Sequence, residues 1–235
     1  MRYRRDDHQS AHTDDTPTGG VTCTEISRVT YAGARASTPH WADMDELSSA
    51  QSALSALRPV LSAITPDDCG LPTPCAGFDV AALGEHLVGT VRMVGAAADA
   101  GFVRFEVVSH DDDIEARVAA STEAVIAVWQ RRGTAGEVVF AGRVMPARLA
   151  LGVLSVELVV HGWDFAQALH RPLGITAAHA DFVLAMARHI ITPASRETAG
   201  FDDPVSVAAD AAALDRLVAY TGRTPRRWPS NMKSR

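Results

Sequence analysis

The 235-residue sequence predicts a mainly α-helical fold, and three observations support that prediction. Hydrophobic residues make up 47% of the chain but aromatic residues only 6%, so Ala, Val and Leu must fill the core, which suits helix packing better than a sheet sandwich. Apolar residues recur at helical spacing in several segments, which are separated by connectors rich in Pro and Gly. The length allows one domain with appendages and a substantial core.

The amino-terminal part of the chain divides near Met44. Residues 1–43 are rich in Asp, Thr, Arg and Gly and lack apolar periodicity, so we expect a disordered N-terminal extension. The first helix is predicted directly after it, because Asp45 is a suitable N-cap and leucines follow at helical spacing. We therefore expect the domain to span residues 44–225 and residues 226–235 to form a tail, and Met44 is a candidate translation start.

Three more helices are predicted in the central part of the chain. A connector dense in Pro and Gly ends at Asp79, a good N-cap for the second helix. The third helix spans residues 111–132, with acidic residues at its start and arginines at its end, as the helix dipole favours. A loop with an extended piece at residues 137–140 leads to Pro146, a favourable first-turn residue for a long fourth helix over residues 146–170.

The rest of the chain is predicted to form a short helical extension. Gly174 is expected to terminate the fourth helix, and residues 175–190 carry apolar side chains at the spacing of a fifth helix. Residues 202–208 are expected to form a short extended segment. A last helix is predicted within residues 211–222.

The composition argues against several classes of protein. A net charge of −6 disfavours nucleic acid as a partner, since phosphate contacts need clustered Lys and Arg. No stretch approaches about 18 uninterrupted apolar residues, so we expect no membrane insertion. Three cysteines without CxxC spacing or a secretion signal indicate a reduced, cytoplasmic protein. Dinucleotide, phosphate-loop, serine-hydrolase and zincin motifs are also missing from the sequence.

The fourth predicted helix carries three polar residues on an apolar face. At about 3.6 residues per turn, Glu157, His161 and Asp164 project within about 60° of one another. Burial of even a neutral polar group without a partner costs about 2–7 kcal/mol. Two arrangements would supply partners: a hydrogen bond between Glu157 and His161 inside a helix bundle, or a divalent metal ion bound by both.

His86, on the second predicted helix, is another isolated imidazole on a mostly apolar strip. By itself it fits a hydrogen-bonded core residue, but with Glu157 and His161 it completes a set of three ligands from two helices. Two imidazoles and one carboxylate suit Zn²⁺ or a similar ion, and three protein ligands leave a coordination position open for water or substrate. A thiol bound there would be deprotonated and nucleophilic near neutral pH.

Three residues near these candidate ligands have other interpretations. Asp164 is expected either to hydrogen-bond the far nitrogen of a liganding histidine or to cap a neighbouring backbone group. Cys75 is interpreted as a small buried hydrophobe rather than a ligand or nucleophile. Trp163 is directed away from the ligand face and is expected to pack between helices.

Two stretches of the sequence resemble the signatures of a known family. PTPCAGFDVAALGEHLVG at residues 72–89 and ELVVHGWDFAQALHRPLG at residues 157–174 are similar to the paired motifs of the mycothiol-dependent maleylpyruvate isomerase metal-binding domain, within the DinB-like superfamily. The resemblance extends over residues 45–225. It implies a DinB-like four-helix bundle with a short C-terminal helical extension and a divalent metal ion on the three ligands named above.

The resemblance also implies a chemistry. Phe78 stands where the family usually has Trp, and the segment after the HGWD motif is shorter than the C-terminal domain of the isomerase, so the chain resembles the shorter relatives. These similarities imply an isomerase or S-transferase in which a metal ion, with Zn²⁺ favoured, activates mycothiol or a similar thiol toward an electrophilic substrate. The alternative is a non-catalytic metal-binding bundle for sensing, storage or partner binding. A homodimer is an open possibility.

Overall fold

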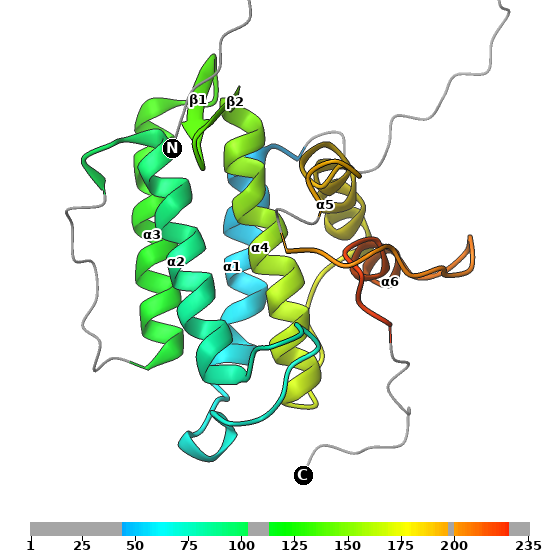
Figure 1. Cartoon of the computed structure of the whole chain (residues 1–235). Coiled ribbons are helices and arrows are strands. Elements are labelled where there is room, and N and C mark those ends of the chain that lie inside the picture. Colours follow the sequence, from blue (N-terminus) through cyan, green and yellow to red (C-terminus); the bar gives the residue numbers. More distant parts are fainter. Residues whose placement is uncertain (1–43, 103–112, 197–199, 226–235) are drawn as a thin grey trace, which may run out of the picture. The chain divides into compact units, whose positions relative to one another are not determined.

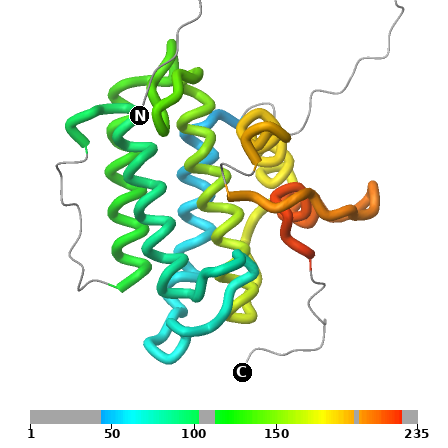
Figure 2. The backbone as a smooth tube through the Cα atoms, viewed as in Figure 1, coloured from blue at the N-terminus to red at the C-terminus, as the bar shows by residue number. Residues whose placement is uncertain are grey.

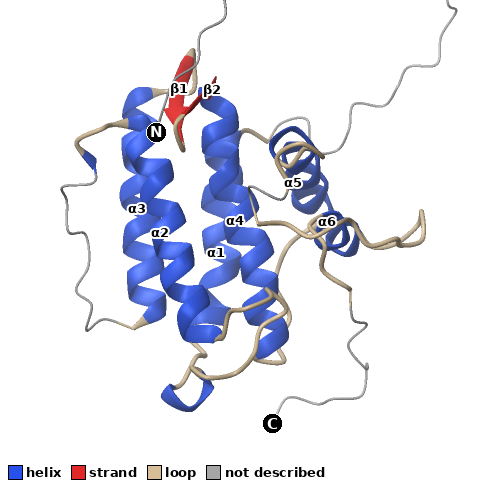
Figure 3. Ribbon diagram, in the orientation of Figure 1, coloured by secondary structure: helices blue, strands red, loops and turns tan. Residues whose placement is uncertain are grey.

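The computed structural model describes residues 44–102, 113–196 and 200–225. The predicted extension at residues 1–43, the tail at 226–235 and the first residues of the predicted third helix lie outside the described residues. Within the described ranges the fold is mainly helical, as the sequence predicts, with six α-helices packed as a bundle (Figure 3).

Four long helices form the body of the bundle (Figure 1). Helices α1 and α2 each contact both α3 and α4, so the four helices surround one apolar core. The predicted four-helix bundle is therefore confirmed. The helices are α1 Glu46–Leu61, α2 Val80–Ala98, α3 Ile114–Arg132 and α4 Ala147–Ala168.

Aspartates begin the first three helices. The carboxylate of each N-cap residue accepts a hydrogen bond from the backbone N–H three positions later, at 2.7–2.8 Å. This contact satisfies one of the free N–H groups of the first turn and favours a negative charge at the positive end of the helix dipole. The predicted caps Asp45 and Asp79 are confirmed, and α3 begins after its N-cap, Asp113.

Helix α4 lies at the centre of the molecule, and 17 consecutive residues from Ala150 to Ala166 are buried. Its length and hydropathy meet the criteria for a candidate membrane span, but 89% of the apolar window is buried within the protein. A core position therefore accounts for its apolar composition. Helix α1 approaches α4 closely at Gly162. A Cβ atom at this position would lie only 3.3 Å from Cδ1 of Leu57 on α1.

The carboxyl end of α4 differs from the prediction. The helix ends at Ala168, and His170 adopts a left-handed conformation with φ of 58°. Arg171 N–H donates to the carbonyl of Ala166 and His170 N–H to that of Gln167, at 2.8 and 3.3 Å. This pair of contacts is a Schellman motif, so His170, and not the expected Gly174, terminates the helix.

A small hairpin precedes α4. Strand β1, Glu137–Phe140, confirms the predicted extended piece, and strand β2, Arg143–Pro146, was not predicted. The strands pair antiparallel with Val139 opposite Val144. Positive φ angles at both residues of the Ala-Gly connection are typical of a two-residue hairpin turn.

Two shorter helices follow α4, and the tube in Figure 2 traces this course of the chain. Helix α5, Ala177–Ile190, packs against α4, and α6, Ala213–Tyr220, packs mainly against α5. The predicted extended segment at residues 202–208 is not a strand. It runs irregularly and is held by a backbone hydrogen bond of 2.9 Å from Val205 N–H to the carbonyl of Ala219.

Candidate metal centre

The three predicted ligands come together where α2 meets α4. Glu157 Oε2 lies 3.1 Å from Nε2 of His161 and 3.8 Å from Nε2 of His86. The two imidazole rings meet edge to face, with centroids 5.1 Å apart. One donor atom from each of the three residues therefore lies within 4.8 Å of the other two. Glu157 and His161 share a face one turn apart on α4, which accounts for their proximity.

The Glu157 carboxylate has an unusual environment for a charged group. Only 9% of the residue is exposed, and Oε2 forms no hydrogen bond within the part of the chain that the structure describes. Nε2 of His161 lies 3.1 Å from this oxygen, as an ion pair when the ring is protonated. A buried carboxylate needs a positive charge beside it, and either a protonated His161 or a cation between the carboxylate and the imidazoles would supply that charge. The donor set and its spacing therefore fit a divalent ion.

His86 lies at the rim of this group. Its side chain is 37% exposed, and the apolar strip predicted around it is incomplete, because Met93 is 50% exposed. Phe78 packs against the His86 ring at a centroid distance of 5.0 Å. The group is therefore closed on the α4 side and reachable from solvent on the α2 side.

The other nitrogen of His161 faces Asp164. His161 Nδ1 lies 3.0 Å from Asp164 Oδ2, and an ionised carboxylate only accepts, so Nδ1–H is the donor. Arg223 donates to the same oxygen from Nη2 at 2.9 Å and to Oδ1 from Nε at 3.3 Å. Of the two alternatives for Asp164, the contact with the histidine is the one observed. It leaves Nε2 of His161 directed toward Glu157.

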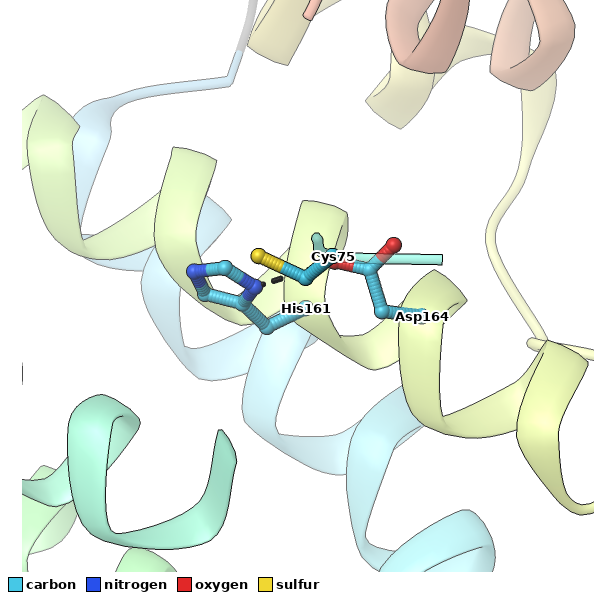
Figure 4. A group of neighbouring side chains, drawn as sticks. All are labelled: Cys75, His161 and Asp164. Atoms are coloured by element: carbon cyan, nitrogen blue, oxygen red, sulfur yellow. Dashed lines mark hydrogen bonds and ion pairs between the residues drawn. The ribbon is translucent and has the colours of Figure 1, made fainter. Parts of the chain in front are cut away.

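Cys75 forms a second group with the same histidine (Figure 4). It lies in the connector before α2 and is only partly buried, so its interpretation as a small buried hydrophobe is incomplete. One donor atom each from Cys75, His161 and Asp164 lies within 4.8 Å of the other two. Cysteine, histidine and aspartate are all metal ligands, so His161 is shared between two candidate ligand sets.

The electrostatics of the metal-free site follow from these contacts. Burial lowers the pKa of His161, but its contacts with Asp164, Cys75 and Glu157 outweigh burial and raise the pKa well above its ordinary value. Burial raises the pKa of Glu157, but the two histidines and Arg223 outweigh it and lower that pKa. For His86, burial dominates and lowers the pKa. A metal ion would therefore have to displace the proton that His161 carries in the metal-free state.

Two cavities flank the site. One of about 320 Å³ is lined by Cys75, Phe78, Phe201 and Arg223, among other residues. The other, of about 580 Å³, lies along the carboxyl end of α4, where Trp163 forms part of its wall. Since Phe78 contacts His86 and Cys75 belongs to the group around His161, the smaller cavity adjoins both sets of candidate ligands.

Sequence reasoning did not identify Arg223. It follows the last helix and reaches Asp164, 59 positions earlier, only through the tertiary fold. No spacing rule relates residues so far apart. For Cys75 the signal was its place in the PTPC motif, but a lone cysteine in a connector has no helical face from which its direction can be inferred.

These observations define the class of protein as a helical domain with a candidate metal site. The chain contains a helical bundle in which the buried central helix and its neighbour direct two imidazoles and a carboxylate to one point, which is the arrangement of a candidate metal-binding domain.

Comparison with known proteins gives the family. Residues 50–166 match the mycothiol maleylpyruvate isomerase N-terminal domain, so this segment belongs to that family, as its motifs indicated. Two uncharacterized proteins of Mycobacterium tuberculosis, from strains CDC 1551 and H37Rv, are each 28% identical over 186 residues, which is 78% of this chain and 100% of the relative. No solved structure matches the chain.

Proposed function

We propose that His86, Glu157 and His161 hold a divalent metal ion, with Zn²⁺ favoured, and that the protein uses a low-molecular-weight thiol such as mycothiol in isomerisation or S-transfer. The observation that carries the proposal is the buried Oε2 of Glu157, which lies between two imidazole nitrogens without a hydrogen bond. A metal ion with three protein ligands lowers the pKa of a thiol at its open coordination position.

The residues of the chain have separate tasks in this proposal. Glu157 and His161 provide ligands from the rigid, buried α4, and His86 provides the third from the partly exposed rim. Of the two ligand sets that contain His161, this one is favoured, because both oxygens of Asp164 in the other set are already engaged by Arg223. A cation among Cys75, His161 and Asp164 would also lie beside a guanidinium charge.

The adjoining cavity supports a small-molecule function. Its volume of about 320 Å³ is at the lower end of the range for ligand sites, and Phe78 and Arg223 give it an apolar wall and a positive charge. We therefore propose small-molecule partners, namely a thiol and an electrophile, and a cytoplasmic location, where thiols are reduced.

The test combines metal analysis with thiol conjugation. The purified protein should contain about one equivalent of metal by elemental analysis, as expected for one three-ligand site. It should then accelerate either the addition of a thiol across the C=C bond of an α,β-unsaturated carbonyl compound or the displacement of halide from an alkyl halide by the thiolate, for one member of a panel of such compounds. The acceleration should disappear on chelation and in His161→Ala. Bound metal without any thiol-dependent rate would instead favour a non-catalytic metal-binding bundle, and absence of metal would refute the site.

A further inference from the structure

Arg223 connects the carboxyl-terminal segment with the candidate metal centre. It lies beyond α6 and outside residues 50–166, which match the family. Arg223 is 7% exposed and Asp164 is completely buried. Burial of a guanidinium costs free energy unless the group is paired and hydrogen-bonded. The partners of Arg223 beside the site therefore determine whether it can be buried there.

We infer that Arg223 is a positioning residue, which acts through Asp164 to hold the imidazole of His161. The guanidinium binds both carboxylate oxygens, at 2.9 and 3.3 Å, and one of these oxygens accepts from His161 Nδ1 at 3.0 Å. A two-point contact prevents the carboxylate from rotating, which a single hydrogen bond does not. The fixed carboxylate in turn holds the ring with Nε2 directed toward Glu157.

The guanidinium is itself held in place from other directions. Nη1 of Arg223 donates to the carbonyl of Thr221 at 3.0 Å, and the guanidinium lies over the Phe201 ring, 5.7 Å from its centroid. These contacts fix the arginine before any ligand arrives, so the orientation of His161 does not depend on the ion. The segment after α6 therefore completes a site whose ligands all lie within the matched domain. This inference rests on the proposed metal ligands.

The first experiment measures Co²⁺ affinity and the Co²⁺ absorption spectrum of the full chain. Arg223→Gln should weaken Co²⁺ binding about 10- to 100-fold, as loss of an outer partner of a metal-bound histidine does, and should change the ligand-field bands. Arg223→Lys keeps the charge but loses the two-point contact, so its Co²⁺ affinity should lie between those of the wild type and Arg223→Gln. The matched control is Arg216→Gln, because Arg216 on α6 pairs with Asp181 at 2.5 Å, away from the site. The control should keep the wild-type affinity and spectrum.

A double-mutant comparison tests whether Arg223 acts through Asp164. Asp164→Ala alone should weaken Co²⁺ binding, and adding Arg223→Gln to it should cause no further loss, because the intermediary is already gone. Thermal unfolding of each metal-free variant separates a change in the site from a loss of fold. If Arg223→Gln does not fold, the Arg223→Lys variant takes its place in the same comparison.

Three outcomes decide the matter. Weakened binding with an altered spectrum, and no additional loss in the Asp164→Ala background, supports the positioning role. Wild-type affinity in both Arg223 variants, or losses that multiply in the double variant, overturns it while leaving the metal site intact. Absence of Co²⁺ binding in the wild type refutes the proposed metal ligands themselves.

Discussion

Two buried histidines in this protein have opposite surroundings. His161 on α4 has a carboxylate near each ring nitrogen, Glu157 at 3.1 Å and Asp164 at 3.0 Å. His179 on α5 has a hydroxyl partner instead, with its Nε2 3.0 Å from Oγ of Ser49 on α1. Both histidines are less than 5% exposed.

The difference shows how a candidate ligand histidine is distinguished from one that is hydrogen-bonded within the core. A neutral imidazole with a hydroxyl partner satisfies its polar atoms inside a core, and burial lowers the pKa of His179. His161 is instead placed among more negative charge than a neutral ring can balance. Burial alone therefore does not identify a site, whereas two carboxylates beside one ring favour either a protonated imidazole or a bound cation.

The largest expected effect comes from replacing His161, which belongs to both candidate ligand sets. His161→Ala should abolish tight Zn²⁺ binding, whereas His179→Ala should keep the wild-type stoichiometry. Since an ion that binds only the folded state adds stability by mass action, saturating Zn²⁺ should stabilise the wild type by about 3–4 kcal/mol at several hundred times Kd. Calorimetric titration and unfolding with and without Zn²⁺ measure both quantities. Equal stoichiometry in the wild type and His161→Ala would remove the basis for the comparison.

The structural histidine should instead affect the metal-free fold. His179→Ala leaves the completely buried Ser49 hydroxyl without this partner, and an unsatisfied buried group costs about 1–3 kcal/mol. Urea unfolding in the presence of chelator should record that loss. The double variant Ser49→Ala, His179→Ala removes both polar partners and is expected to be no less stable than His179→Ala, because no orphaned hydroxyl remains. A clearly less stable double variant would contradict this account.

The two histidines should also respond to pH with opposite signs in the metal-free protein. Folding lowers the pKa of His179. Its contribution to the free energy of unfolding is therefore present above the unfolded pKa of about 6.5 and is lost as pH falls through the folded pKa. The pKa of His161 is raised, so its contribution is present below about 6.5 and is lost as pH rises through the folded pKa.

Comparison of variants isolates these two contributions. Between pH 5.5 and 8.5, the stability difference between wild type and His179→Gln should shrink on the acid side. The difference between wild type and His161→Gln should shrink on the alkaline side, with a slope of up to about 1.4 kcal/mol per pH unit. Unfolding in denaturant at several pH values, with chelator present, measures both. Parallel curves for the two variants would show that the histidines do not differ in the way their surroundings indicate.

The sequence could predict the features that depend on local helix geometry. The caps Asp45 and Asp79 follow from the N-cap preference of Asp, and the shared face of Glu157 and His161 follows from helical periodicity, so local geometry was enough to predict both. His86 was grouped with that face because it is an isolated imidazole on an apolar strip, and the paired motifs implied the same set of three ligands. The metal itself remains a prediction.

The features that were missed have non-local or atypical causes. The hairpin before α4 turns through Ala141 at φ 47°, a position where Asn, Asp or Gly would have been the usual signal. Helix α4 ends at Ala168, and His170, two residues later, adopts a left-handed conformation that glycine adopts more readily. Arg223 reaches Asp164 only because α6 and the segment after it fold back toward α4.

The smallest expected effect distinguishes the two groups that share His161. Because Arg223 already holds both oxygens of Asp164, the metal should lie on the Nε2 side of the ring, and Cys75 should not be a ligand. Cys75→Ser should therefore retain the stoichiometry and ligand-field spectrum of bound Co²⁺. Cys69→Ser is the matched control, since Cys69 is the other free cysteine in the described residues. A thiolate-to-cobalt charge-transfer band in the wild type that disappears only in Cys75→Ser would instead assign the ion to Cys75, His161 and Asp164.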